Sequence, residues 1–212
     1  MITMTPTHYA CPLCSLPLLN QAAVFRCENN HSFDCAKENY LNLLPVQFKH
    51  SKNPGDNKAM VNARRAFLEQ GYYQPLMNRL LALYHEKMPA DANKPAIVLD
   101  AGCGEGFYTH QHKNAENTVY GVDIAKEAIK KAGKKYKNCH FSVATLSKLP
   151  FADSLFSWIV SVYAPILENE FTRVLSPGGF LLTVTPAKQH LMQLKQQIYD
   201  DAKEHDIEKL PI

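Results

Sequence analysis

Four residues near the amino terminus have the types and the spacing of a zinc site. They are Cys11, Cys14, Cys27 and His31, in the pattern C-x2-C-x12-C-x3-H. The first two thiolates can reach one ion across their two-residue gap, and the second pair completes a tetrahedron. Four protein ligands close the coordination shell, so we expect a structural zinc. Cys35 is a competing ligand, but the shorter gap from Cys27 favours His31.

The segment between the two ligand pairs must fold back on itself to bring them together. Residues 16–26 carry apolar side chains and are long enough for two short strands. A module of roughly 35 residues buries too little apolar surface to fold alone, so the metal should hold it together. Some zinc modules bind nucleic acid and others act as scaffolds, and the spacing does not decide between these roles.

A second group of residues surrounds a glycine turn in the middle of the chain. Asp100, Gly102, Gly104 and Gly106 form D-x-G-x-G-x-G directly after an apolar run. A nicotinamide-binding turn has G-x-G-x-x-G, which cradles a pyrophosphate. This turn departs from that pattern and resembles motif I of the class I S-adenosylmethionine methyltransferases. Asp123 ends the next apolar run, where an acid would accept the two ribose hydroxyls.

The elements around this turn alternate between strands and helices. A helix is expected at 125–135, between two of the strands. Such alternation predicts a parallel α/β sheet with ligands at the carboxyl ends of its strands. The expected strands are 96–101, 118–123, 140–144, 156–163 and 179–186. We therefore expect an α/β fold: a Rossmann-like class I methyltransferase domain with a small N-terminal zinc-binding module.

The segment between the two halves reads as a connector with two helices. Residues 45–60 are rich in Pro, Lys, Asn and Gly without periodicity. A short amphipathic helix is expected at 60–71, and Pro75 opens a second one. The expected division is a zinc-binding module at 1–44, bridging helices at 45–90 and a methyltransferase domain at 91–212.

Two later segments are similar to the methyltransferase superfamily. "LPFADSLFSWIVS" resembles the approach to the fourth strand, with Ser157 in place of a frequent aspartate, and "RVLSPGGFLLTVTP" resembles the approach to the fifth. Ala144 and Thr145 end the third strand, where the adenine edge is normally read in this superfamily. These resemblances imply S-adenosylmethionine as the cofactor.

The whole chain resembles the RlmA-type large-subunit (23S) ribosomal RNA guanine-N1 methyltransferases. The shared features run in order: the Cys/His module, "FDCAKENYLNLLPVQ", "NPGDNKAMVNARRAFLEQGYYQPL", "LDAGCGEGFYTH", "YAP" and "TPAKQHLMQLK". The resemblance implies cofactor contacts at Tyr73, Gly104, Glu105 and His190. It also implies an RNA-binding cleft formed with the zinc module, often in a homodimer. Family members continue past "HLMQLKQQIY", so the last strands of the sheet are expected to be missing here.

Composition limits the classes of protein. The 212 residues are 46% hydrophobic with a formal net charge of +3, and no apolar run approaches the ~18 residues of a membrane span. The amino terminus has no basic and apolar leader pattern. We expect a cytoplasmic protein that binds no membrane.

The candidates for chemistry on the methyl acceptor are less specific. Tyr163, in "YAP" at the end of the fourth expected strand, can stack on or hydrogen-bond to a guanine, or belong to the core. Glu168 and Glu170 are candidates to accept the guanine proton, or belong to a solvated helix start. Four basic residues are candidates for RNA phosphates: Lys49, Lys52, Arg64 and Arg65.

Two other functions stay open, because the glycine turn and Asp123 do not identify the methyl acceptor. One is a small-molecule methyltransferase with a scaffolding zinc module. The other is a non-catalytic zinc-dependent RNA-binding protein.

Overall fold

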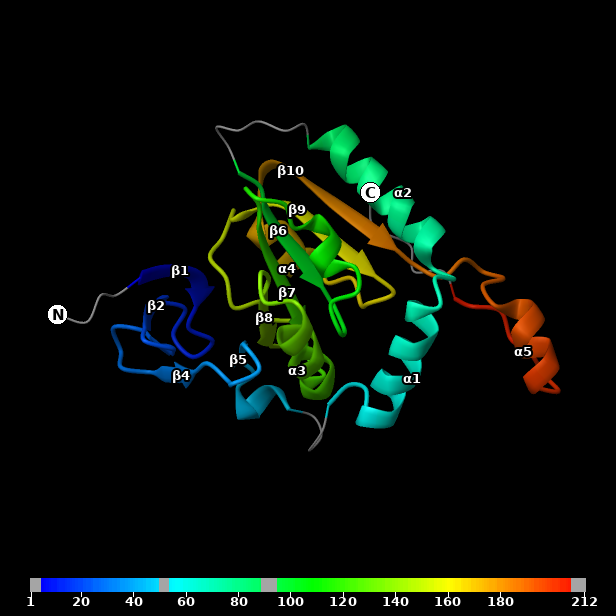
Figure 1. Cartoon of the computed structure of the whole chain (residues 1–212), viewed down its shortest axis with the longest axis horizontal. Coiled ribbons are helices and arrows are strands. Elements are labelled where there is room, and N and C mark those ends of the chain that lie inside the picture. The colour runs from blue at the N-terminus through cyan, green and yellow to red at the C-terminus, as the bar shows by residue number, and fades with distance from the viewer. Residues whose placement is uncertain (1–4, 50–53, 89–94, 207–212) are drawn as a thin grey trace.

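The computed structural model describes residues 5–49, 54–88 and 95–206 (Figure 1). The small sheet at the amino terminus has strands β1 (Thr5–Ala10), β2 (Pro17–Gln21), β3 (Val24–Arg26) and β4 (Ser32–Asp34). The large sheet has β5 (Tyr40–Asn42), β6 (Ile97–Ala101), β7 (Thr118–Asp123), β8 (His140–Val143), β9 (Phe156–Val162) and β10 (Leu175–Val184). The helices are α1 (Lys58–Glu69), α2 (Gln74–Lys87), α3 (Lys126–Lys135), α4 (Glu168–Val174) and α5 (Met192–Ile198), with short 3-10 turns at η1 (Val46–Phe48) and η2 (Thr109–His112).

The large sheet is parallel throughout, in the order β10-β9-β6-β7-β8-β5. All five predicted strands are present. β10 begins earlier than predicted, because Leu175 pairs with Phe156 ahead of a register irregularity before Phe180. β6 lies between β7, which follows it in the chain, and β9, which comes much later, and this change of direction leaves a crevice at the strands' carboxyl ends. In Figure 1 these ends point toward the side on which α1 lies.

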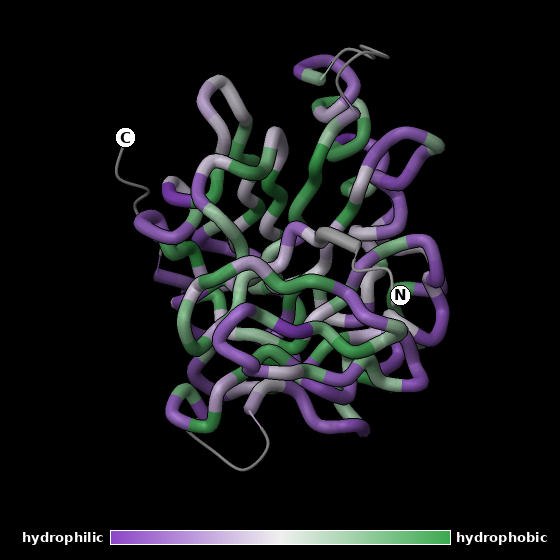
Figure 2. The backbone as a smooth tube through the Cα atoms, turned by 90° about the vertical axis from the view of Figure 1, so that its left-hand side faces the viewer, coloured by the Kyte–Doolittle hydropathy of each residue, from purple (hydrophilic) through white to green (hydrophobic). Residues whose placement is uncertain are grey.

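Both faces of the large sheet are covered, as a parallel sheet requires. In β6, Val98 packs in a cluster with Leu80 of α2 and Ile129 of α3. Leu99, on the opposite face, packs in a cluster with Phe171 of α4 and with residues of the amino-terminal module. In Figure 2 hydrophilic stretches mark many of the outer loops of the backbone, and hydrophobic stretches lie between them.

The amino-terminal module forms a four-stranded antiparallel sheet in the order β1-β2-β3-β4. β2 and β3 pair as a hairpin, as the segment 16–26 predicted. The chain then enters the large sheet, where β5 pairs in parallel with β8. This edge strand was not predicted, because three residues are too short to show a periodicity. The division at residue 44, which falls just after β5, stays a proposal.

Helices α1 and α2 form the predicted bridge. The Asn57 side chain caps α1 by accepting a hydrogen bond from the Met60 N–H, and Pro75 lies in the first turn of α2. α1 packs against α3 and so lies beside the carboxyl ends of the strands. Among the described residues, no helix is both long and apolar enough to cross a membrane.

Candidate functional site

The four predicted metal ligands come together in the amino-terminal module. Their ligand atoms all lie within 4.8 Å of one another. His31 Nδ1 is 3.5 Å from both Cys11 Sγ and Cys27 Sγ, and Cys14 Sγ is 3.6 Å from Cys27 Sγ. A zinc tetrahedron with bonds of about 2.0–2.3 Å has edges of about 3.5–3.8 Å, so the residues fit the ion.

Cys35 lies outside this cluster. Its Sγ contacts its neighbour's carbonyl, Ala36 O, at 3.7 Å. The geometry therefore favours His31 over Cys35 as the fourth ligand.

The turn after β6 brings the backbone to the edge of a cavity. Gly102 has φ +82°, and a Cβ there would lie 2.3 Å from Ala164 Cβ, so only glycine fits. Gly104 has φ +54°, and a Cβ there would meet no atom within 4 Å. The open space beside Gly104 lets a ligand approach the backbone closely.

Asp123, at the end of β7, is oriented by the same turn. Its Oδ2 accepts a hydrogen bond from the Gly104 N–H at 2.8 Å, and its Oδ1 accepts one from the Ala125 N–H at 2.7 Å. Burial raises the pKa of this carboxyl, and the two N–H groups counter that effect. Each oxygen keeps a lone pair for a further donor, which suits a diol such as the two ribose hydroxyls.

The cavity at these strand ends has a volume of ≈ 510 Å³, within the usual range for a small-molecule site. Its wall includes the connector and α1, through Gly55, Asp56 and Phe67, as well as the sheet. The predicted site residues that line it are Tyr73, Gly102, Gly104, Glu105, Asp123, Thr145 and Tyr163. The volume, the open glycine and the oriented carboxylate fit an adenosyl sulfonium.

Two arginines of α1 pair with acids at this wall. Arg65 Nε donates to Glu105 Oε2 at 2.7 Å, where the Glu105 side chain is only 6% exposed. Arg65 Nη2 is buried and has no acceptor among the described residues. Arg64 pairs with Asp56, and both line the cavity. Arg64 therefore lines the pocket, and Arg65 holds Glu105, a residue of its wall. The sequence suggested these arginines for RNA phosphates, and in the fold each is already paired with a carboxylate.

The other basic candidates have different positions. Lys49 is exposed after η1, and Lys52 lies outside the described residues. The spacing of charged residues gave no sign of the partners of Arg64 and Arg65, which lie next to them only in the folded chain.

Asp100 and Ala144 lie beneath the cavity and do not line it. The Asp100 carboxylate is 1% exposed and accepts a hydrogen bond from Thr109 Oγ1 at 2.6 Å. Burial raises its pKa to about 7. Ala144 is buried and donates its N–H to the carbonyl of Asp123 at 3.1 Å. Asp100 thus stabilises the carboxyl end of β6, and Ala144 stabilises that of β7, without lining the cavity.

Aromatic rings surround the mouth of the cavity. Tyr163 has φ +54° and is 42% exposed, a strained conformation held by a hydrogen bond from its N–H to Val184 O at 2.9 Å. Its ring lies 6.2 Å from that of Tyr73 and 5.4 Å from that of His190. His190 does not line the cavity, but it flanks Tyr163, which does.

Glu170 is not placed to accept a proton from a substrate. Its carboxylate pairs with Arg173 and accepts the Leu149 N–H at 2.7 Å, away from the cavity. Burial opposes its charge, but these hydrogen bonds outweigh burial and lower the pKa of Glu170. Glu168 begins α4 and also does not line the cavity.

Known protein families match both parts of the chain. Residues 9–52 match the model "RlmA, N-terminal", a zinc ribbon, and residues 92–210 match the model "Methyltransferase domain". In structure, the chain is similar to a putative S-adenosyl-L-methionine-dependent methyltransferase from Methanococcus maripaludis, with TM-score 0.54 and 14% identity over 71% of this chain and 74% of that one. That likeness supports the fold.

Two curated relatives match most of the chain. The 23S rRNA (guanine(748)-N(1))-methyltransferase of Streptomyces fradiae is 35% identical over 88% of this chain and 66% of its own length. A putative 23S rRNA (guanine-N(1)-)-methyltransferase of Micromonospora griseorubida is 34% identical over 90% of this chain and 70% of its own length. The chain thus spans about two thirds of each relative. With its zinc ribbon and its S-adenosylmethionine-type domain, the chain belongs to the family of RlmA-type 23S rRNA (guanine-N1-)-methyltransferases.

Proposed function

We propose that this chain transfers a methyl group from S-adenosylmethionine to N1 of a guanine in a hairpin of 23S ribosomal RNA. The observation that carries the proposal is that similarity to named rRNA methyltransferases extends over both the zinc module and the catalytic domain. A small-molecule methyltransferase would share only the second of these. The reaction would take place in the cytoplasm.

Different residues of the pocket are proposed to bind different parts of the cofactor. When bound, S-adenosylmethionine supplies a methyl group on a positively charged sulfur, which is a good leaving group. Asp123 is proposed to accept the ribose hydroxyls, Gly104 and Glu105 to border the methionyl part, and Thr145 to border the adenine. We propose that Asp100, Gly102 and Ala144 act through the backbone they support, and His190 through the ring of Tyr163.

Tyr163 is proposed to hold the guanine. Partial burial is the main cause that raises the pKa of Tyr163, and the nearby Tyr73 raises it further. The hydroxyl therefore stays protonated at neutral pH. A protonated hydroxyl can donate a hydrogen bond to O6, which gains charge as N1 loses its proton. The exposed ring at the cavity mouth can also stack on a base that has left its helix. Tyr163 would therefore position the base and stabilise charge, and would not act as the general base.

The direct test is to incubate the chain with unmodified 23S rRNA and S-adenosylmethionine labelled in the methyl group. We expect label on one guanine, together with a stop in reverse transcription there, because N1-methylation blocks base pairing. Tyr163→Phe should lose part of kcat, and Tyr163→Ala should lose more. Label on a small acceptor in place of RNA would contradict the proposal, as would S-adenosylmethionine binding without any transfer.

A homodimer is also proposed, from the family resemblance alone. Light scattering of the purified chain should then give twice the chain mass. If the chain is a monomer and still methylates RNA, the homodimer is wrong and the proposed reaction stands.

A further inference from the structure

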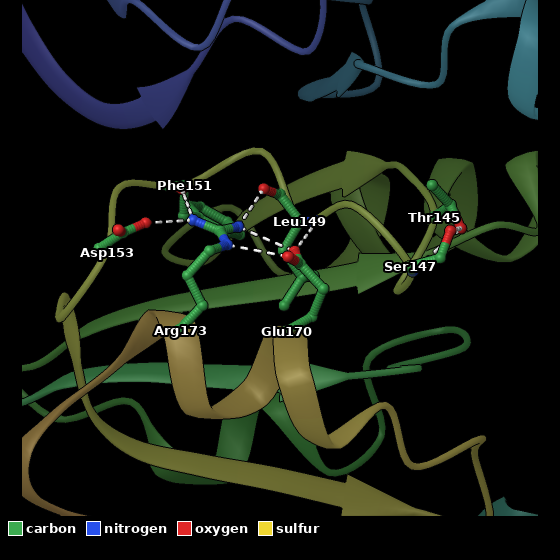
Figure 3. A network of polar contacts seen from close by, with 7 residues as sticks. All are labelled: Thr145, Ser147, Leu149, Phe151, Asp153, Glu170 and Arg173. Carbon is green, nitrogen blue, oxygen red and sulfur yellow. Dashed lines mark hydrogen bonds and ion pairs between the residues drawn. The ribbon is translucent and has the colours of Figure 1, made fainter.

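One arginine outside the cavity makes an unusually complete set of contacts. Arg173, in the last turn of α4, donates to both carboxylate oxygens of Glu170 at 2.8 Å and to Asp153 Oδ1 at 2.8 Å. The same guanidinium donates to two main-chain carbonyls, Phe151 O at 2.9 Å and Leu149 O at 3.0 Å. Figure 3 shows the side chain reaching from the helix into the loop above it.

These contacts fix the loop 145–154, which joins β8 to β9. Glu170 Oε2 also accepts the Leu149 N–H at 2.7 Å, so both polar groups of Leu149 are held by the Arg173–Glu170 pair. A guanidinium is suited to this role because its five donors lie in one rigid plane. Within the loop itself, Leu149 O also accepts the Phe151 N–H at 2.9 Å, whereas the acceptor of the Leu149 N–H is Glu170.

The loop segment 149–151 also contacts the zinc module. The Ala10 N–H donates to Pro150 O at 2.9 Å, and Tyr9 forms an isolated antiparallel bridge with Phe151. The Tyr9 and Phe151 rings stack at 5.2 Å. Ala10 is directly followed by Cys11, one of the metal ligands. The Arg173 contacts and the zinc module therefore hold the same stretch of main chain from its two sides.

The other end of this loop reaches the cofactor cavity. Thr145 and Ser147 line the cavity, and their hydroxyls hydrogen-bond at 2.8 Å (Figure 3). Between the metal knuckle and the loop, a crevice of ≈ 240 Å³ is lined by Arg173 and Glu170. The module also packs on the large sheet through the Tyr9 and Tyr120 rings, 5.2 Å apart, so the main-chain contacts of Ala10 and Tyr9 with the loop add to that packing.

We infer that Arg173, with Glu170, is a positioning residue that sets the zinc module in register with the methyl-transfer pocket through the loop 145–154. The inference rests on the proposed function for its consequence, which is that RNA held on the zinc module meets the pocket at the right distance. A displacement of about 1 Å far from the reacting atoms can cost about 100-fold in rate.

The test compares Arg173→Met and Arg173→Lys with wild type in the full, zinc-loaded chain. Hydrogen exchange should show lost protection at the Ala10 and Leu149 amides in both variants, with the β6 and β7 amides unchanged. Lysine should not rescue, because it keeps the charge but not the planar fork. Asp153→Asn, at the 75% exposed end of the network, is the matched control and should behave as wild type.

Binding and activity complete the test. We expect zinc content and the dissociation constant for S-adenosylmethionine to stay within about twofold of wild type, and kcat/KM for RNA to fall about 10- to 100-fold. If Arg173→Met proves too unstable, Glu170→Gln tests the same contacts more gently. Unchanged protection at Ala10, or full rescue by lysine, would overturn the inference. If wild type modifies no RNA, the proposed function fails, and the exchange measurement still decides the role of Arg173.

Discussion

The metal cluster and the cofactor cavity are two sites built in opposite ways. The cluster takes all of its ligands from a short stretch, Cys11 to His31, and one ion can fix them. The cavity takes its wall from segments between Gly55 and Leu167, held by hydrogen bonds, ion pairs and packing. A site made from near neighbours can be recognised from spacing, whereas a site made from distant segments needs the fold.

Because of this difference, the loss of one residue should have different effects at the two sites. Loss of one metal ligand should remove the whole cluster, because the ion provides most of the stability of a small module. Loss of one cavity contact should weaken the site by a modest amount, because the others remain. The predictions below test this contrast.

The largest effect is expected for Cys27→Ser. It should release the zinc and cost at least about 5 kcal/mol of unfolding free energy, since metal binding and folding are coupled. Zinc content and urea unfolding measure this. Cys35→Ser is the control, because Cys35 lies outside the cluster, and it should keep the metal. If Cys27→Ser loses its zinc and still has the unfolding free energy of wild type, the metal does not stabilise the module and the two sites do not differ in this way.

The next effect concerns Asp100 and has a defined dependence on pH. The pKa of Asp100 is raised from 3.8 to about 7 by burial, so the folded chain holds this proton more tightly than the unfolded one. Unfolding free energy should therefore fall as pH rises between these values, by about 2–4 kcal/mol. Asp100→Asn should lack that fall in denaturant titrations at pH 4 to 8. Asp153→Asn, at an exposed carboxylate, should retain it.

A smaller effect is expected for Asp123→Asn. The amide has one acceptor oxygen, so it loses the charge, one acceptor for the ribose and one of the hydrogen bonds from the Gly104 and Ala125 N–H groups. Affinity for S-adenosylmethionine should fall by about 1.5–3 kcal/mol, roughly 10- to 100-fold, and the melting temperature should fall by a few degrees because of the lost backbone hydrogen bond. Calorimetric titration measures it. Equal affinity in variant and wild type would show that the cofactor does not contact Asp123.

The smallest effect is expected for Arg65→Met. Glu105 would lose its partner at the cavity wall, and S-adenosylmethionine affinity should fall by about 1 kcal/mol, roughly fivefold. Arg79→Met, at an exposed position of α2, should leave the affinity unchanged. A loss limited to RNA binding would instead restore the phosphate role that the sequence suggested for Arg65.

The sequence predicted those parts whose signals are local. The strands were visible as apolar runs, the metal ligands as a spacing, and the glycine turn as a motif. The short strand β5, the Arg65–Glu105 pair and the contacts of Arg173 were not visible, because each joins residues far apart in the chain. His190 was implied only by resemblance, and its nearest ring, Tyr163, became clear only in the fold.

The parallel pairing of β5 with β8 has a consequence for how the chain is made. Tyr40 meets Phe141, which the ribosome adds about a hundred residues later. The ligands for the metal leave the ribosome early and can capture their ion at once, but the strand that follows them must wait unpaired until β8 has emerged. Synthesis thus sets an order of events in which metal capture precedes closure of the sheet's edge.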